Sequence, residues 1–135
     1  MVFSYHKRIY GYECDSYGHM NNASYLQMLE AARSEALIGM NMSINTLRDK
    51  NIHIYLNRLE IDFKKGLKLE EQVTVKTWIE KGNRLRAIWM QEVFNSNDEL
   101  CCRASIFGAF VKDGRPHRLS PEEYEIFVPF VKNVL

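Results

Sequence analysis

The chain has 135 residues with a formal net charge of +1, and 46% of its residues are hydrophobic. This length matches one ordinary domain, and the apolar fraction suffices for a core without disulfide or metal support. Because 18 Lys and Arg residues balance 17 Asp and Glu residues, no net field would hold a polyanion or an anionic membrane surface. We therefore expect one domain over residues 1–135, with neither a nucleic acid nor a membrane as partner.

Apolar runs and cysteines bear on the location of the protein. The longest apolar run, 106–111, is far shorter than the roughly 20 residues of a membrane-spanning helix. Residues 1–8 lack the apolar centre of a signal peptide. The three cysteines are an odd set, and Cys101 and Cys102 are neighbours, between which a disulfide would be strained. The sequence therefore predicts a reducing, cytoplasmic setting.

The first two predicted elements are a strand and a long helix. Residues 2–13 are rich in Phe, Tyr, Ile and Val with polar residues between them, which is typical of a strand. Beyond this segment the apolar residues recur every three or four positions, which predicts an amphipathic helix over about 22–38. Asn21 or Asn22 can cap its first N–H groups, and Gly39 can adopt the left-handed conformation after its last turn.

The middle of the chain is β-patterned. A short helical turn over 43–50, capped by Ser43, precedes it. Within residues 58–64 the alternation is strict and places the apolar residues on one face and the charged residues on the other. Strands are predicted at about 52–64, 73–80, 85–94 and 100–111, with turns at 81–84, 95–98 and 112–114.

The end of the chain predicts a terminal helix. Ser120, Pro121 and Glu123 supply the cap, the first-turn proline and the acid of a capping box, so the helix should span about 121–128 and end at Pro129. The element order is then strand, long helix, four antiparallel strands and short helix. It predicts an α+β fold in which a five-stranded antiparallel sheet curls around the long helix and buries it.

Residues 13–25, between the first strand and the helix, hold the densest cluster of polar chemistry in the chain. In a structural interpretation, Asp15 is a turn residue, His19 packs and the paired Asn residues cap the helix. In a catalytic interpretation, Asp15 faces a helix N-terminus whose free N–H groups, beginning near Asn22, hold a developing oxyanion. A carboxylate beside an oxyanion hole suits acyl transfer.

This segment contains the motif Asp15-x-x-Gly18-His19-x-Asn21-Asn22-x-x-Tyr25-Leu26, followed by Leu29-Glu30-x-Ala32-Arg33. The motif resembles the signature of hotdog-fold acyl-CoA thioesterases, the 4-hydroxybenzoyl-CoA thioesterase-like group. Its His-x-Asn-Asn-x-x-Tyr part is also similar to acyl-ACP thioesterases. The resemblance implies a hotdog fold, with the sheet wrapped around the long helix, subunits paired through their sheets and sites at the dimer interface.

The resemblance assigns roles by position. Asp15 matches the catalytic carboxylate, the N–H of Asn22 matches the donor that polarises the thioester carbonyl, and His19 lies where many members place a His. Tyr25 of the motif is assigned to the substrate site. We expect Asp15 to act as a general base, with direct attack on the carbonyl as the alternative. Coenzyme A enters as part of the substrate, and neither a cofactor nor a metal is expected, because no metal-ligand spacing accompanies these residues.

The family's coenzyme A groove usually draws basic residues from the turn between its central strands. The matching residues, which we assign to substrate binding, are Lys81, Asn83, Arg84 and Arg86. Leu85 stands where many members carry a small hydroxyl residue, and the structural alternative for this turn is a solvated hairpin tip. Cys14 is expected to pack rather than react, because neighbouring strand residues point to opposite faces.

These observations predict an acyl-CoA thioesterase that hydrolyses its substrate to the free acid and coenzyme A. The alternative is a non-catalytic acyl-CoA or acyl-ACP binding or sensing module of the same fold, which would not need a carboxylate at Asp15. A hydratase of this fold would carry its His and Asp in a different motif, after the helix begins. Because a lone curved sheet leaves an edge strand exposed, we expect a homodimer or homotetramer. The resemblance places Asp15 opposite residues 57–63 of the partner subunit.

Overall fold

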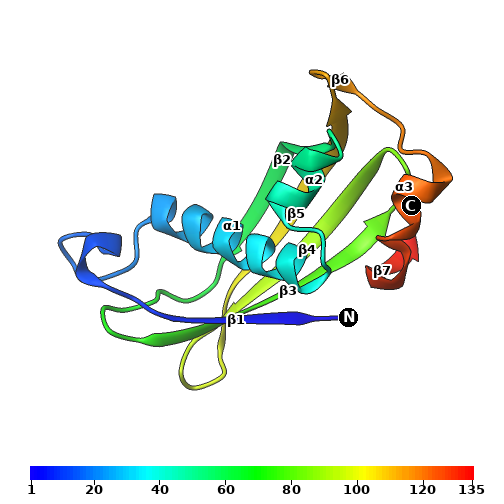
Figure 1. Cartoon of the computed structure of the whole chain (residues 1–135). Coiled ribbons are helices and arrows are strands. Elements are labelled where there is room, and N and C mark those ends of the chain that lie inside the picture. Colours follow the sequence, from blue (N-terminus) through cyan, green and yellow to red (C-terminus); the bar gives the residue numbers. More distant parts are fainter.

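The computed structural model describes all residues from Met1 to Leu135. The helices are α1 (Asn22–Gly39), α2 (Ile44–Asp49) and α3 (Pro121–Glu125), with 3₁₀ turns at Gly11–Glu13 and Val128–Phe130. The strands are β1 (Phe3–Arg8), β2 (His53–Phe63), β3 (Gln72–Gly82), β4 (Arg86–Phe94), β5 (Leu100–Lys112), β6 (Arg115–Pro116) and β7 (Val131–Val134). Figure 1 shows one sheet that curls around α1, and the α+β architecture predicted from the sequence is confirmed.

The main path of the sheet runs β1-β3-β4-β5-β2, and all neighbours on this path are antiparallel. Two short strands enlarge the predicted five to seven. Strand β6 pairs with β5, and β7 pairs with β3 in parallel, with Ile79 opposite Val131. Sequence patterning did not reveal β7, because four residues are too few to show an alternation. This order leaves β2 at one edge, where only β5 pairs with it.

The first strand is shorter than predicted, because it ends at Arg8 rather than near residue 13. The chain then folds back through the first 3₁₀ turn. There Lys7 forms an ion pair with Glu13, and Glu13 Oε1 accepts a hydrogen bond from the Tyr10 N–H at 3.0 Å. Glu13 is buried, so its carboxylate needs both partners. This turn leads the chain from the sheet into the loop that precedes α1.

Helix α1 agrees with its predicted span to within one residue. Its N-cap is Asn21, whose Oδ1 accepts from the Ser24 N–H at 2.9 Å. The role predicted for Gly39 is wrong, because Gly39 is the last helical residue and Asn41 takes the left-handed conformation, with φ 59°. A Cβ at position 39 would lie 2.7 Å from Phe3 Cε1, so the glycine allows β1 to approach the helix closely.

Helix α3 also ends earlier than predicted, at Glu125 rather than near Val128. The chain turns there so that the ring of Phe127 packs on Phe110, with centroids 5.5 Å apart. Phe127 is 2% exposed, and burial of such a side chain contributes about 1.5–3 kcal/mol. This contact fixes the position of the chain just beyond the end of the helix. Helix α2 and its Ser43 cap are as predicted.

Ser120→Ala is expected to lower the free energy of unfolding by about 1 kcal/mol. Ser120 Oγ accepts from the Glu123 N–H at 3.1 Å, and Glu123 Oε1 accepts from the Ser120 N–H at 2.8 Å, so the substitution removes half of the capping box of α3. Urea unfolding of the variant and the wild type measures the difference. The exposed Ser96→Ala is the matched control, and an equal loss in both variants would contradict the prediction.

The core lies between α1 and the inner face of the sheet, and the strands nearest to α1 are β1 and β3. The inner face of β2 is less covered. Its residues Leu56, Leu59 and Phe63 are 51%, 41% and 50% exposed. The apolar face predicted for this strand is therefore present, but only half of its surface is buried within one protomer.

Candidate active site

The loop between the first 3₁₀ turn and α1 is held as a tight turn by its own hydrogen bonds. Asp15 Oδ1 accepts from the N–H groups of Tyr17 at 2.9 Å and His19 at 3.2 Å. Gly18 has φ +75°, a conformation that other residues disfavour. Asp15 is exposed, and its Oδ2 has no hydrogen-bond partner in the chain. One carboxylate oxygen is therefore free to accept a proton.

The N-terminus of α1 supplies unpaired donors. The Asn21 side chain satisfies the Ser24 N–H, but the N–H groups of Asn22 and Ala23 have no acceptor within the chain. The aligned peptide dipoles of the helix add partial positive charge at this end. The two donors can therefore stabilise negative charge on a carbonyl oxygen.

A cleft of about 250 Å³ opens beside this N-terminus. It is lined by Met20, Asn22, Tyr25, Phe63, Lys64, Lys65 and Gly66. The rings of Tyr25 and Phe63 pack edge to face, with centroids 5.0 Å apart. Burial raises the pKa of Tyr25 to about 12, so this phenol stays neutral. The pair gives the cleft an apolar side next to the free donors of α1.

Neither Asp15 nor His19 is among the residues that line the cleft. The backbone of His19 pairs with Lys68, and its ring lies beside Gly66, where a Cβ would be 3.6 Å from His19 Cδ2. His19 is exposed, and its ring nitrogens form no hydrogen bond within the chain. The structure thus gathers Asp15, His19, Asn22 and Tyr25 at one end of α1, without a hydrogen bond between the His19 ring and the Asp15 carboxylate.

Cys14 lies beside Asp15 but is poorly suited to act as a nucleophile. Its Sγ donates to the Tyr10 carbonyl at 3.6 Å. Burial, followed by the charges of Glu13 and Asp15, raises the pKa of the Cys14 thiol. The thiolate is therefore disfavoured near neutral pH, which agrees with the packing role expected from the sequence.

The basic hairpin turn lies far from Asp15 within one protomer. Figure 1 shows the loop before α1 at one end of the molecule and the turn between β3 and β4 at the other. His19 pairs with Lys68 shortly before β3, and the turn follows the end of that strand. The 11 residues of β3 span about 35 Å at about 3.3 Å per residue. Lys81, Asn83, Arg84 and Arg86 therefore do not reach the candidate site of their own protomer.

Two of these four turn residues have local structural roles. Asn83 Oδ1 accepts from two N–H groups of the turn at 2.8 and 3.0 Å. Arg84 Nε donates to the Leu119 carbonyl at 2.7 Å. Lys81 and Arg86 are exposed and form no ion pair. Of the set, these two are the side chains free to contact a ligand.

Sequence reasoning missed two lysines at the cleft. Lys64 and Lys65 follow β2 and line the cleft beside Asn22. Lys65 is paired with Glu99, whereas Lys64 forms no ion pair. Along the chain Lys64 continues the charged face of an alternating strand and Lys65 follows it, and only the fold places both at the N-terminus of α1.

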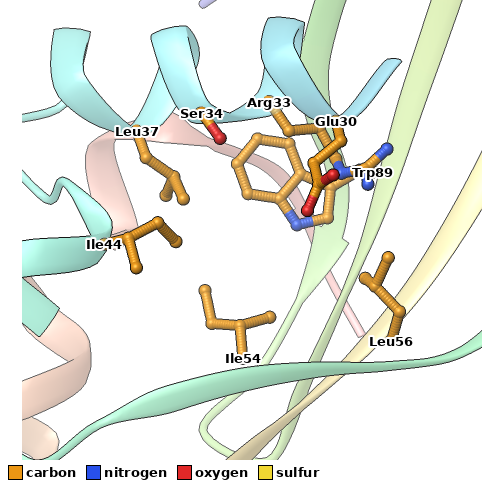
Figure 2. A pocket seen from close by; sticks show the side chains of 8 residues that line it. All are labelled: Glu30, Arg33, Ser34, Leu37, Ile44, Ile54, Leu56 and Trp89. Atoms are coloured by element: carbon orange, nitrogen blue, oxygen red, sulfur yellow. The ribbon is translucent and has the colours of Figure 1, made fainter. Parts of the chain in front are cut away.

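A second cavity, of about 210 Å³, also escaped sequence reasoning. It lies further along α1, between that helix, α2, β2 and β4. Figure 2 shows its lining residues, Glu30, Arg33, Ser34, Leu37, Ile44, Ile54, Leu56 and Trp89. Glu30 and Arg33 belong to the motif quoted above, but nothing in their spacing indicated a cavity.

No three His, Cys, Asp or Glu side chains lie close enough together to hold a metal ion. None of the helices combines the length and apolar character that a membrane crossing requires. The three cysteines are unpaired thiols, and Cys101 and Cys102 are buried.

A family profile described as the thioesterase-like superfamily matches residues 11–127. The crystal structure of a DHNA-CoA thioesterase from Staphylococcus aureus has a TM-score of 0.87 and 26% identity, covering 95% of this chain and 89% of that one. The structure of a hypothetical protein from Aquifex aeolicus has a TM-score of 0.85 and 25% identity, covering 92% and 98% respectively. The long-chain acyl-CoA thioesterase FadM of Escherichia coli is 28% identical over 86 residues, 64% of each chain.

The curled sheet around α1, together with these matches, defines a hotdog-fold thioester hydrolase. The chain belongs to the thioesterase-like superfamily. The family resemblance carried by the motif from Asp15 to Arg33 is thereby confirmed. The comparisons assign no role to single residues, so the roles of Asp15, His19, Asn22 and Tyr25 stay predictions.

Proposed function

We propose that this protein hydrolyses acyl-CoA thioesters to the free acid and coenzyme A. One observation carries the proposal: a free carboxylate oxygen on Asp15 and unpaired N–H groups on Asn22 and Ala23 lie around one end of α1, beside a cleft. The names of similar proteins support coenzyme A as the thiol carrier, because a DHNA-CoA thioesterase and a long-chain acyl-CoA thioesterase are among them.

The proposed reaction uses these groups in sequence. The thioester carbonyl oxygen accepts hydrogen bonds from the N–H groups of Asn22 and Ala23. Asp15 Oδ2 takes a proton from water as the water oxygen attacks the carbonyl carbon. The same N–H groups and the helix dipole stabilise the tetrahedral oxyanion. Its collapse breaks the C–S bond and releases the coenzyme A thiolate, which is protonated by Asp15 or by solvent.

A panel of acyl-CoA esters, assayed by detection of free thiol, tests the proposal. Thiol release above the buffer rate supports it. A non-catalytic acyl-CoA or acyl-ACP binding module, the alternative, predicts saturable binding without thiol release. Acyl-ACP substrates in the same panel show which thiol carrier the enzyme accepts.

We further propose that the working unit is a homodimer, or a homotetramer built from such dimers. Strand β2 is an edge of 11 residues, and its inner face carries half-exposed apolar side chains. Exposed edges of this length pair with another chain unless they are covered. Pairing two β2 edges across a twofold axis satisfies both edges. Because the basic turn is remote within one protomer, Lys81 and Arg86 can meet coenzyme A at this site only from a partner subunit.

Lys64→Ala is expected to raise the KM for an acyl-CoA about fivefold, with little effect on the matching pantetheine thioester. Lys64 lines the cleft and forms no ion pair, so its ammonium group is free to contact the nucleotide phosphates that pantetheine lacks. Steady-state kinetics on both thioesters measure the effect. Equal losses on the two substrates would contradict a phosphate contact.

Arg86→Ala is the matched variant at the basic turn. Arg84 is less suitable, because its bond to the Leu119 carbonyl makes it structural. If a partner subunit brings the turn to the site, Arg86→Ala should also raise the KM for acyl-CoA selectively. An unchanged KM would leave the turn as a solvated hairpin tip.

A further inference from the structure

The cavity in Figure 2 has an apolar wall and a polar end. Its volume of about 210 Å³ exceeds the roughly 150 Å³ of a cavity that holds benzene. The apolar wall is formed by Leu37, Ile44, Ile54 and Leu56. Glu30, Arg33 and Ser34 line it from α1, and Trp89 lines it from β4. The cavity therefore has room for a ring or a short length of hydrocarbon with one polar substituent.

Trp89 offers an unused hydrogen-bond donor to this cavity. The residue is 2% exposed, and its indole N–H has no partner within the chain. Figure 2 shows the indole nitrogen on the edge of the ring that faces Ile54 and Leu56. Trp78 differs, because its Nε1 donates to Glu80 Oε2 at 3.0 Å. No buried side-chain nitrogen or oxygen of the chain lacks a partner, so this N–H is open to the cavity and to water. An apolar ligand group that displaced the water would leave the donor unpaired, so a ligand acceptor at this position is favoured.

A hydrogen bond to the buried Gln91 holds the Arg33 side chain beside the cavity. Its Nη1 donates to Gln91 Oε1 at 2.8 Å, and Gln91 Nε2 donates to the Leu29 carbonyl at 2.9 Å and to Thr77 Oγ1 at 3.0 Å. Gln91 is fully buried, so this network fixes the guanidinium group. Burial lowers the pKa of Arg33, but the group remains a cation with further N–H donors.

The charges at the polar end are balanced. Glu30 contributes one carboxylate and Arg33 one guanidinium, and Glu30 forms no ion pair or hydrogen bond of its own within the chain. An anionic or cationic ligand group would meet one attractive and one repulsive partner. A hydroxyl group both donates and accepts, so it can donate to Glu30 while accepting from Trp89.

The cavity lies at a defined distance from the candidate catalytic end of α1. Glu30 and Ser34 follow Asn22 by eight and twelve residues, about 12–18 Å at about 1.5 Å per residue. Along β2 the half-exposed Leu59 lies between Leu56 at the cavity and Phe63 at the cleft. Because tetrahedral angles reduce the advance per C–C bond of about 1.5 Å to about 1.25 Å along an extended chain, roughly ten to fourteen carbon atoms span this distance.

We propose that this cavity receives the distal end of the acyl group, and that the preferred acyl group is a medium-length chain carrying a hydroxyl near that end. Trp89 and Glu30 are the specificity-determining residues, and Gln91 positions Arg33 beside them. The inference rests on the proposed thioesterase function, because it assumes that the thioester carbonyl lies at Asn22.

Paired substrates test the preference. The kcat/KM for 12-hydroxydodecanoyl-CoA is expected to exceed that for dodecanoyl-CoA by about tenfold or more. Trp89→Phe keeps a ring but removes the N–H, and should reduce this ratio about fivefold or more. Glu30→Gln, at an exposed helix position, should reduce it as well. Trp78→Phe is the matched control and should keep the wild-type ratio. An unchanged ratio in both Trp89→Phe and Glu30→Gln would overturn the assignment of these residues.

A binding measurement separates this inference from the proposed function. The chain has two tryptophans, so in Trp78→Phe the fluorescence reports Trp89 alone. In that variant 12-hydroxydodecanoic acid should bind about tenfold more tightly than dodecanoic acid, and no turnover is needed. Equal Kd values for the acids and equal kcat/KM values for the thioesters would overturn the inference and leave the thioesterase proposal standing. Preferential binding of the hydroxy acid without hydrolysis of either thioester would support the cavity assignment and overturn the thioesterase proposal.

Discussion

Asp15→Asn is expected to lower kcat for acyl-CoA hydrolysis by about 100-fold or more. The amide oxygen of Asn can still accept from the N–H groups of Tyr17 and His19, so the loop keeps its shape. What the variant loses is the free Oδ2 that, in the proposed mechanism, takes the proton from water. Binding of acyl-CoA should therefore survive, and steady-state kinetics combined with calorimetric binding to the inactive variant measure both effects.

His19→Ala is the comparison within the same loop. The His19 ring forms no hydrogen bond with Asp15, so its removal should cost less activity than Asp15→Asn. A larger loss in His19→Ala would transfer the role of base to His19. Near-normal turnover in Asp15→Asn would remove Asp15 from the mechanism altogether.

Leu59→Asp is expected to dissociate the proposed dimer and to reduce activity at least about tenfold. Leu59 is 41% exposed on the inner face of the edge strand β2, and the paired edges would bury this position further. An unpaired carboxylate buried there would oppose association by several kcal/mol. Light scattering gives the mass of the particle, and activity measured over a dilution series of the wild type shows whether turnover depends on association.

Val128→Asp is a suitable control for this experiment. Val128 is 53% exposed and lies in the second 3₁₀ turn, away from β2, so the same charge should leave the assembly and the activity intact. Circular dichroism of both variants shows whether they fold. A folded, monomeric and fully active Leu59→Asp protein would contradict an active site that depends on the β2 edge.

The elements that local sequence alone determined are those whose stabilising contacts lie within a few residues. Helix α1 follows from its apolar period and its Asn21 cap, and the cap bond to Ser24 spans three residues. The strict alternation of 58–64 assigned the inner face of β2 for the same reason. The motif that begins at Asp15 is equally local, because a loop of a few residues and one helix end bring its groups together.

Tertiary structure decided what depends on contacts between distant segments. Gly39 allows Phe3 to approach the helix closely, and Phe127 packs on Phe110 just beyond the last helix. Neither contact leaves a periodic signal in its own neighbourhood. Strand β1 ends at Arg8 because Arg8 pairs with Gln72, the first residue of its partner strand β3, whatever the strand-like composition of residues 9–13.

The candidate site shows the same difference between features set by local sequence and features set by tertiary contacts. The sequence by itself determined the helix end and the family and predicted Asp15 as the carboxylate, because these residues lie within a single segment that a motif can describe. Only the fold showed that the basic turn is the length of β3 away from Asp15, and that Lys64 lies at the cleft instead. Only the fold assembled the cavity that Glu30 and Trp89 line, since those residues are remote in sequence and come together because α1 and β4 border the same cavity. The number of residues between two positions does not give the distance between their side chains. That distance depends on the register of the strands, which is set by the burial of the whole sheet.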